Sequence, residues 1–295
     1  MRYFPAVTLA ALRVTLAAVL MVPLYLVGVG RDRSASSRGL SAGSLRSSGQ
    51  ASRSPTRIGR SYSARDVWIF AYLGFFSVVM NQVCFTVGLR YTSVTHAAVI
   101  VGMGPIYALL LAVLMRLEKA TRAKVMGMAV AFAGIAVLAS DNLRSEPSSI
   151  IGDAITFCGS MGFALYVVLG KRVAARYDSL TMTAFNHFAG GLLILPVAIR
   201  GVWALGGLEG LRRIPWQGWV AVLYMAAFGS AVAYLVYFWL LRHFEPSRLT
   251  AFTYALPVVA TLMGILWLGE PASWTQAAGG GLALAGLYWV EAGRR

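Results

Sequence analysis

The sequence predicts an all-α polytopic membrane protein, a helix bundle built from an inverted repeat. Of its 295 residues, 58% are apolar and only 13% are charged, whereas soluble proteins average about 25% charged residues. Too few polar side chains are present to cover a soluble fold, and the apolar content excludes a disordered chain. The other two observations are a series of apolar segments of membrane-spanning length and an internal duplication.

Nine apolar segments have the length that a bilayer core requires of a helix, about 20 residues. Their uniform apolar character excludes barrel strands, which alternate, and a helix satisfies its own backbone hydrogen bonds in lipid. We therefore expect nine spans in the lipid bilayer, at residues 6–28, 67–89, 95–116, 122–140, 151–171, 180–200, 217–240, 248–268 and 273–291.

Basic residues predict how the spans are oriented. Of 26 lysines and arginines, 19 fall on one side of the nine spans and six on the other, while Arg13 lies inside the first span. Basic residues favour the cytoplasmic side. We therefore expect a multi-pass protein of the inner (plasma) membrane, with the C-terminus and the Ser/Arg loop 31–65 in the cytoplasm. That loop could also bind nucleic acid or anionic lipid. No aromatic residue interleaves its arginines before Tyr62, so we interpret it as a solvated linker and expect no nucleic-acid partner.

The chain also matches itself. A shift of 152 residues aligns 72–134 with 224–286 without a gap, and a shift of 173 aligns the first span with 180–200. Matching spans lie five spans apart along the chain, which is an odd number, so the two copies are inverted in the membrane, as in secondary transporters and some channels. Matching pairs include Tyr72 and Tyr224, Phe76 and Phe228, Pro105 and Pro257, Glu118 and Glu270, Gly127 and Gly279, and Gly134 and Gly286.

The two predicted repeats differ in length. The first, 1–140, holds four helices and the Ser/Arg loop, whereas the second, 150–293, holds five helices. The partner of 151–171 would lie upstream of Met1. Either the start codon lies further upstream or the first helix has been lost, and Phe4-Pro5 favours the former because it reads as the end of a loop that leaves a helix.

The repeated residues resemble the EamA repeat of the drug/metabolite transporter superfamily. The resemblance covers nearly the whole chain outside 31–65. It implies ten helices arranged as five plus five, of which nine are visible here, and transport of small metabolites across bacterial inner membranes. We expect no cofactor. The residues that carry it are Gly88-Leu89-Arg90-Tyr91-Thr92-Ser93, Pro105, Leu117-Glu118, Gly127 and Gly134, and then Pro257, Leu268-Gly269-Glu270-Pro271, Gly279 and Gly286.

Arg13 and the matched prolines are the first candidates for transport. An arginine inside a span costs about 2.5–3.5 kcal/mol on insertion scales, so Arg13 either anchors an anionic group or extends its charge to the interface. Pro105 and Pro257 each remove a backbone hydrogen bond in mid-span, and we expect a hinge or a cavity there.

Glu118 and Glu270 end their helices just before a turn. They could carry protons, but a carboxylate placed there more often caps the N-terminus of the following helix. No carboxylate lies deep in any predicted span, so the sequence does not predict a buried proton relay.

Polar residues within the spans should face the bundle interior, where their hydrogen bonds can be satisfied. Each could be a contact between helices, but together some should line the path of a small solute. The substrate-path candidates are Asn81, His96, Tyr166, Asn186, His187, Tyr234 and Tyr254, with Arg13. Small residues form two further faces, Gly127/Ala131/Gly134 and Gly279/Ala283/Gly286, which could pack within one chain or in a homodimer.

We therefore expect a secondary transporter that exports small metabolites or drug-like solutes by alternating access. One alternative is an intramembrane enzyme with Ser160 as nucleophile and His187 as base, but nothing orients the histidine and a Gly-Ser pair usually serves packing. The other is a truncated or non-transporting membrane protein. No metal is expected, because the chain has three histidines and no Cys/His cluster.

Overall fold

A computed structural model describes residues 4–42, 63–143, 148–268 and 273–293 of the chain, and within them every regular element is helical. The first predicted repeat contributes α1 (Ala6–Ala42), α2 (Ala64–Gly74), η2 (Phe75–Cys84), α3 (Phe85–Gly88), α4 (Val94–Gly102), α5 (Gly104–Leu114) and α6 (Arg122–Leu143). The second contributes α7 (Ile150–Ala174), α8 (Ser179–Ala204), α9 (Gly207–Arg212), α10 (Trp216–Ala226), η3 (Ala227–Val232), α11 (Ala233–His243), α12 (Pro246–Ala251), η4 (Phe252–Tyr254), α13 (Ala255–Leu268) and α14 (Trp274–Ala292).

The helices confirm a protein of membrane-spanning segments, although not the predicted number of nine. Among the described residues, 8 helical segments are long and apolar enough to cross a membrane, and each coincides with a predicted span. The ninth prediction, 273–291, coincides with α14, which is helical but is not one of these 8 segments. Large apolar side chains such as Leu114, Leu256 and Leu266 are exposed on the spans, as expected for surfaces that contact lipid.

The first helix is longer than its predicted span. We expected the helix to end at residue 28 and a loop to begin at 31, but α1 continues to Ala42. The sequence after Val29 offers no proline before Pro55 to stop the helix, and its alanines, arginines and leucine are compatible with helix. The part of the predicted loop at 43–62 lies outside the described residues.

The chain forms two compact units, and neither corresponds to a single repeat. Unit 1 consists of residues 1–78 and 172–242, and unit 2 consists of residues 79–171 and 243–295. Each unit therefore contains helices from both predicted repeats. The units are mixed because helices related by the repeat pack on each other.

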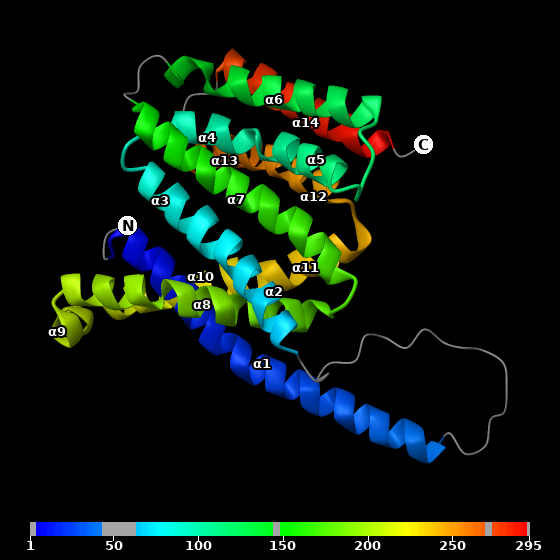
Figure 1. Ribbon diagram of the computed structural model, residues 1–295. Helices are drawn as coiled ribbons and strands as arrows, with labels where there is room; N and C mark the ends of the chain where they lie inside the picture. The colour runs from blue at the N-terminus through cyan, green and yellow to red at the C-terminus, as the bar shows by residue number, and fades with distance from the viewer. Residues whose placement is uncertain (1–3, 43–62, 144–147, 269–272, 294–295) are drawn as a thin grey trace. The chain divides into compact units, whose positions relative to one another are not determined.

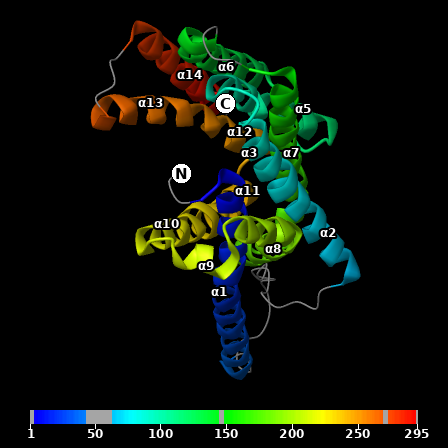
Figure 2. The same cartoon turned by 90° about the vertical axis from the view of Figure 1, so that its left-hand side faces the viewer.

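In unit 2, α6 and α14 pack against each other through their small-residue faces (Figure 1). A Cβ added at Gly127 would lie 2.8 Å from the carbonyl oxygen of Gly286, and one at Gly134 would lie 2.6 Å from that of Gly279. Residue numbers rise along α6 as they fall along α14, so the helices are antiparallel. Figure 2 shows the same pair side by side. The small-residue faces thus meet within one chain and are not free to form a homodimer.

In unit 1, α1 and α8 form the corresponding pair, related by the 173-residue shift. A Cβ at Gly191 would lie 3.0 Å from the Cβ of Ala18, and one at Gly201 would lie 2.6 Å from the Thr8 side chain. The contacts again run antiparallel. Repeat-related helices therefore pack on each other in both units, which is the arrangement that an inverted duplication produces.

The repeat also extends to unusual backbone. Two segments form π-helix, η2 from Phe75 and η3 from Ala227. Their first residues are separated by the 152-residue repeat shift. Because π-helix is rare and is enriched at functional sites, its recurrence in both copies indicates that these two spans contribute to function.

Candidate functional site

Two repeat-related spans are broken ahead of a proline. The first ends as α4 at Gly102 and resumes as α5 at Gly104, so that Pro105 lies in the first turn of α5. The second passes from α12 through the 3-10 turn η4 into α13, where Pro257 is the third residue. We expected a hinge or a cavity at each proline. The α-helix is interrupted at Met103, two residues before Pro105, and over Phe252–Tyr254, which ends three residues before Pro257. Proline has no N–H to donate to the carbonyl oxygen four residues earlier, so one helical hydrogen bond is missing near each break.

The repeat-related prolines Pro23 and Pro196 show that not every matched proline interrupts its helix. Pro23 and Pro196 also match each other in the repeat, but they lie inside the continuous helices α1 and α8. A proline within a span therefore does not by itself interrupt the helix in this protein.

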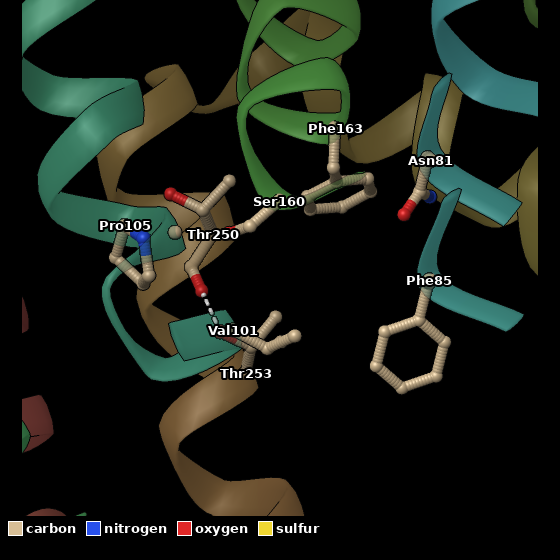
Figure 3. Close-up of a pocket in the computed structure, with 9 residues that line it drawn as sticks. Asn81, Phe85, Val101, Pro105, Ser160, Phe163, Thr250 and Thr253 are labelled. Atoms are coloured by element: carbon tan, nitrogen blue, oxygen red, sulfur yellow. Dashed lines mark hydrogen bonds between the residues drawn. The ribbon is translucent and has the colours of Figure 1, made fainter. Parts of the chain in front are cut away.

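A cavity of about 180 Å³ lies at these breaks, entirely within unit 2 (Figure 3). Its walls come from η2, α3, α4, α5, α7, α12 and η4. Apolar side chains form most of the lining, and four neutral polar side chains interrupt them. The lining residues are Asn81, Phe85, Val101, Gly104, Pro105, Ser160, Phe163, Thr250 and Thr253.

Three of the four polar side chains are hydrogen bonded to backbone. The Thr250 hydroxyl donates to the carbonyls of Pro246 and Ser247, each at 3.0 Å, and the Thr253 hydroxyl donates to that of Thr250 at 2.7 Å. The Ser160 hydroxyl donates to the Ile100 carbonyl at 3.5 Å, which is a long contact.

The fourth, Asn81, makes no side-chain hydrogen bond within the described part of the chain. Figure 3 shows its carboxamide beside the same space as Ser160 and Phe163. An amide offers two donors and an acceptor with two lone pairs. Asn81 is therefore the polar group of this cavity with the most unused hydrogen-bonding capacity.

Glu118 belongs to a buried ion network at one end of unit 2. Its carboxylate accepts from the Nζ of Lys124 at 2.7 Å, from the hydroxyl of Ser247 at 2.7 Å and from the backbone N–H of Ser247 at 3.2 Å. Lys124 also lies 2.9 Å from Glu245, which lies 3.0 Å from Arg248. Glu118 thus contacts the first turn of α12, while Thr121 caps the next helix in the chain, α6.

His96 lies at the start of α4, beside Asp153 in the first turn of α7. The His96 Nδ1 and an Asp153 carboxylate oxygen are 3.5 Å apart, and the Thr92 hydroxyl donates to the other Asp153 oxygen. Both ring and carboxylate are partly exposed. These contacts join the ends of α4 and α7, so His96 lies at a helix end and outside the cavity lining.

Four path candidates lie in unit 1. Asn186 is buried and accepts from the Ser77 hydroxyl at 3.2 Å, and His187 is buried with its Nδ1 2.9 Å from the Thr183 carbonyl. Tyr234 meets the His187 ring edge to face. The Nε of Arg13 is buried without a hydrogen bond, and no described carboxylate pairs with this arginine.

The remaining candidates have other environments. Tyr166 and Tyr254 are fully buried in unit 2, and Tyr254 packs in a core with Met128 and Leu287. Among the path candidates and hinge prolines that the structure describes, Asn81 and Pro105 line the cavity. Pro257 lies further along the same broken span as Thr250. Glu270 lies outside the described residues.

Sequence reasoning missed several residues that the fold brings together. In the sequence, Lys124 and Arg248 are only two of the basic residues near span ends, and Glu245, Thr250 and Thr253 are not candidates. One signal was available for the threonines: two hydroxyl residues three apart, just before a repeated proline, can occupy one helix face. No local pattern could pair Lys124 with Glu245, because they lie in different repeats, far apart along the chain.

A bundle of apolar helices with an inverted duplication, paired broken spans and a cavity at the breaks defines the class of multi-pass membrane transporters. The model of the EamA-like transporter family matches residues 1–140 and 150–291. The chain belongs to the EamA-like transporter family. The family consists of transporters, so the enzyme alternative built on Ser160 and His187 is set aside.

Similar proteins agree with this assignment. A protein of Archaeoglobus fulgidus named as an uncharacterized transporter is 31% identical over 75% of this chain and 76% of its own length. A protein of Streptantibioticus cattleyicolor named "Probable terminal-alkyne amino-acid exporter" is 25% identical over 77% of this chain and 74% of its own. A solved crystal structure with 17% identity shares the fold, with a TM-score of 0.70 over 97% of this chain and 89% of that one.

Proposed function

We propose that this protein is a secondary transporter that exports small metabolites or drug-like solutes across the bacterial inner membrane by alternating access. The observation that carries the proposal is the pair of repeat-related spans broken before Pro105 and Pro257, both of which border the cavity. A broken helix frees backbone groups for a solute and can bend at the break. The cavity in unit 2 is the proposed solute site.

Direction and orientation form part of the same proposal. Export is supported by the relative from Streptantibioticus cattleyicolor, which is named as a probable exporter. The 19-to-6 distribution of basic residues supports a cytoplasmic C-terminus. A reporter enzyme fused after Arg295, active only in the cytoplasm or only in the periplasm, would test the orientation.

Flux measurements test the proposed function. Proteoliposomes containing the protein should show saturable flux of a radiolabelled solute from a panel of amino acids and small aromatic metabolites. Pro105→Ala and Pro257→Ala should each lower the flux at least several-fold, because alanine restores the missing N–H and favours a continuous helix. Arg13→Leu should also lower it, because the Nε of Arg13 is buried without a hydrogen bond and is available to a solute.

Pro23→Ala is the matched control, because Pro23 lies in a continuous helix and has an exposed side chain. It should leave the flux close to that of the original protein. Flux that is indifferent to both broken-span prolines and to Arg13 would contradict the mechanism, and the absence of saturable flux for every solute would contradict transport.

A homodimer stays an untested prediction, now without the small-residue faces that suggested it.

A further inference from the structure

The cavity at the broken spans limits the size, charge and polarity of a group that can bind there, and the sequence did not indicate these limits. About 180 Å³ is small beside the roughly 300–1,000 Å³ of pockets that hold drug-sized ligands. The space therefore suits one small group, such as a single ring with a short polar substituent. The cavity volume therefore limits the size of the chemical group that can enter.

The charge of that group is bounded as well. No lysine, arginine, histidine, aspartate or glutamate is among the described residues that line the cavity. A buried charge needs a partner of opposite sign, and an ion that enters without one loses its hydration uncompensated. The lining therefore disfavours both a cationic and an anionic group.

The lining residues also indicate which apolar and hydrogen-bonding features a bound group should have. Phe85 and Phe163 provide aromatic surface, and Asn81 provides an amide without a hydrogen-bond partner within the described residues (Figure 3). An amide can both donate and accept, so it complements another amide or a similar neutral polar group. Aromatic walls with one amide match an amphipathic group.

We propose that this cavity selects a small, uncharged, amphipathic group of the solute. Asn81 recognises this group by hydrogen bonding, and the space beside Gly104 limits the size of the group. The inference rests on the proposed function, because it describes the solute of that transporter. A Cβ added at Gly104 would meet only the Ser160 Oγ, at 3.5 Å. Alanine therefore fits there without displacing backbone and takes its volume from the cavity.

Binding to the full-length protein in detergent tests this selectivity without measuring transport. Benzamide, benzoate and benzylamine share one ring and differ in charge at neutral pH. Benzamide should raise the unfolding temperature in a dose-dependent way, with an affinity at least about tenfold above those of the two ions, because neither ion finds a counter-charge. Equal affinities for the three probes, or no stabilisation by benzamide, would overturn the proposal.

Substitutions at Asn81 separate recognition from folding. Asn81→Leu should weaken benzamide binding about three- to tenfold through the lost hydrogen bonds. Asn81→Asp keeps the shape, adds a negative charge and should reverse the preference toward benzylamine. If benzylamine gains nothing in Asn81→Asp although that variant unfolds at a normal temperature, Asn81 is not the recognition group.

Gly104→Ala tests the size limit, and Gly281→Ala is its control. A Cβ at Gly281 would meet nothing within 4 Å, and Gly281 does not line the cavity. Gly104→Ala should weaken benzamide binding several-fold at an unchanged unfolding temperature, whereas Gly281→Ala should not affect binding. Equal binding by both variants would overturn the size assignment.

Two further outcomes distinguish this inference from the proposed function. If butylbenzene stabilises the protein as well as benzamide does, the occupant is purely apolar, such as a lipid chain, and the inference fails. If benzamide binding depends on Asn81 but no solute shows saturable flux, the selectivity stands and transport fails. If a solute shows saturable flux but benzamide binding does not depend on Asn81, transport stands and the selectivity fails.

Discussion

Unit 2 contains two helix pairs, each related by the same 152-residue shift. One pair packs closely, and the other leaves a cavity. The pair α6 and α14 brings backbones together at glycines and leaves no space between them. The other pair, the broken spans α4–α5 and α12–α13, is interrupted before its prolines, and a cavity of about 180 Å³ lies at the breaks. One duplication thus produced a pair of helices packed closely at their glycines and a pair of interrupted spans beside a cavity.

Glu118 joins the two pairs, and removing it should have the largest effect on stability. It follows α5 and contacts both Lys124 of α6 and Ser247 of α12. Glu118→Ala leaves the buried Lys124 with Glu245 as its one described carboxylate partner and the Lys119 carbonyl as an acceptor. A loss of about 3 kcal/mol is therefore expected, at the lower end for broken buried ion pairs. Unfolding of the detergent-solubilised protein with increasing SDS measures this.

Glu209→Ala is the control for that experiment, since Glu209 lies exposed in the short helix α9. Its unfolding should be unchanged. If the two glutamate variants unfold alike, the ion network does not stabilise the junction between the closed and the broken pair.

Gly279→Ala tests the closed pair and should have the second largest effect. The new Cβ would lie 2.6 Å from the Leu138 backbone nitrogen and 2.7 Å from the Gly134 carbonyl oxygen. Backbone cannot move aside as a side chain can, so a cost of about 1–3 kcal/mol is expected. The same SDS titration measures it.

Gly281→Ala lies two residues further along the same helix and has open space around its Cβ. It should be neutral, or stabilising by up to about 1 kcal/mol, because alanine is the better helix former. Equal destabilisation by both variants would show that helix propensity, and not backbone contact, explains the result.

Gly102→Ala tests where the broken pair meets the closed one, and it should have the smallest effect. The added Cβ would lie 3.3 Å from the Cγ2 of Ile135, a side-chain atom of α6 that can move by a few tenths of an ångström. We expect a change under about 1 kcal/mol. A loss as large as that of Gly279→Ala would mean that the broken pair is packed as rigidly as the closed one.

The sequence predicted much of the fold and less of the site. Hydropathy placed helices at all nine predicted segments, and the duplication indicated that Pro105 and Pro257 occupy equivalent places in their spans. Asn81 is a path candidate in the sequence, and the structure places it in the cavity lining. The sequence did not indicate Gly104, Thr250 or the partners of Glu118, because a side chain's partner across the bundle leaves no mark in its local pattern.

Helix positions, the duplication and the family were thus determined by the sequence alone, because apolar length and repeated residues are local properties that can be read along the chain. Tertiary structure decided which faces meet. The glycine faces of α6 and α14 could have packed between chains, and only the folded backbone shows them packed on each other. The same holds for the cavity and for Lys124, since contacts between residues far apart in sequence exist only once the helices have packed.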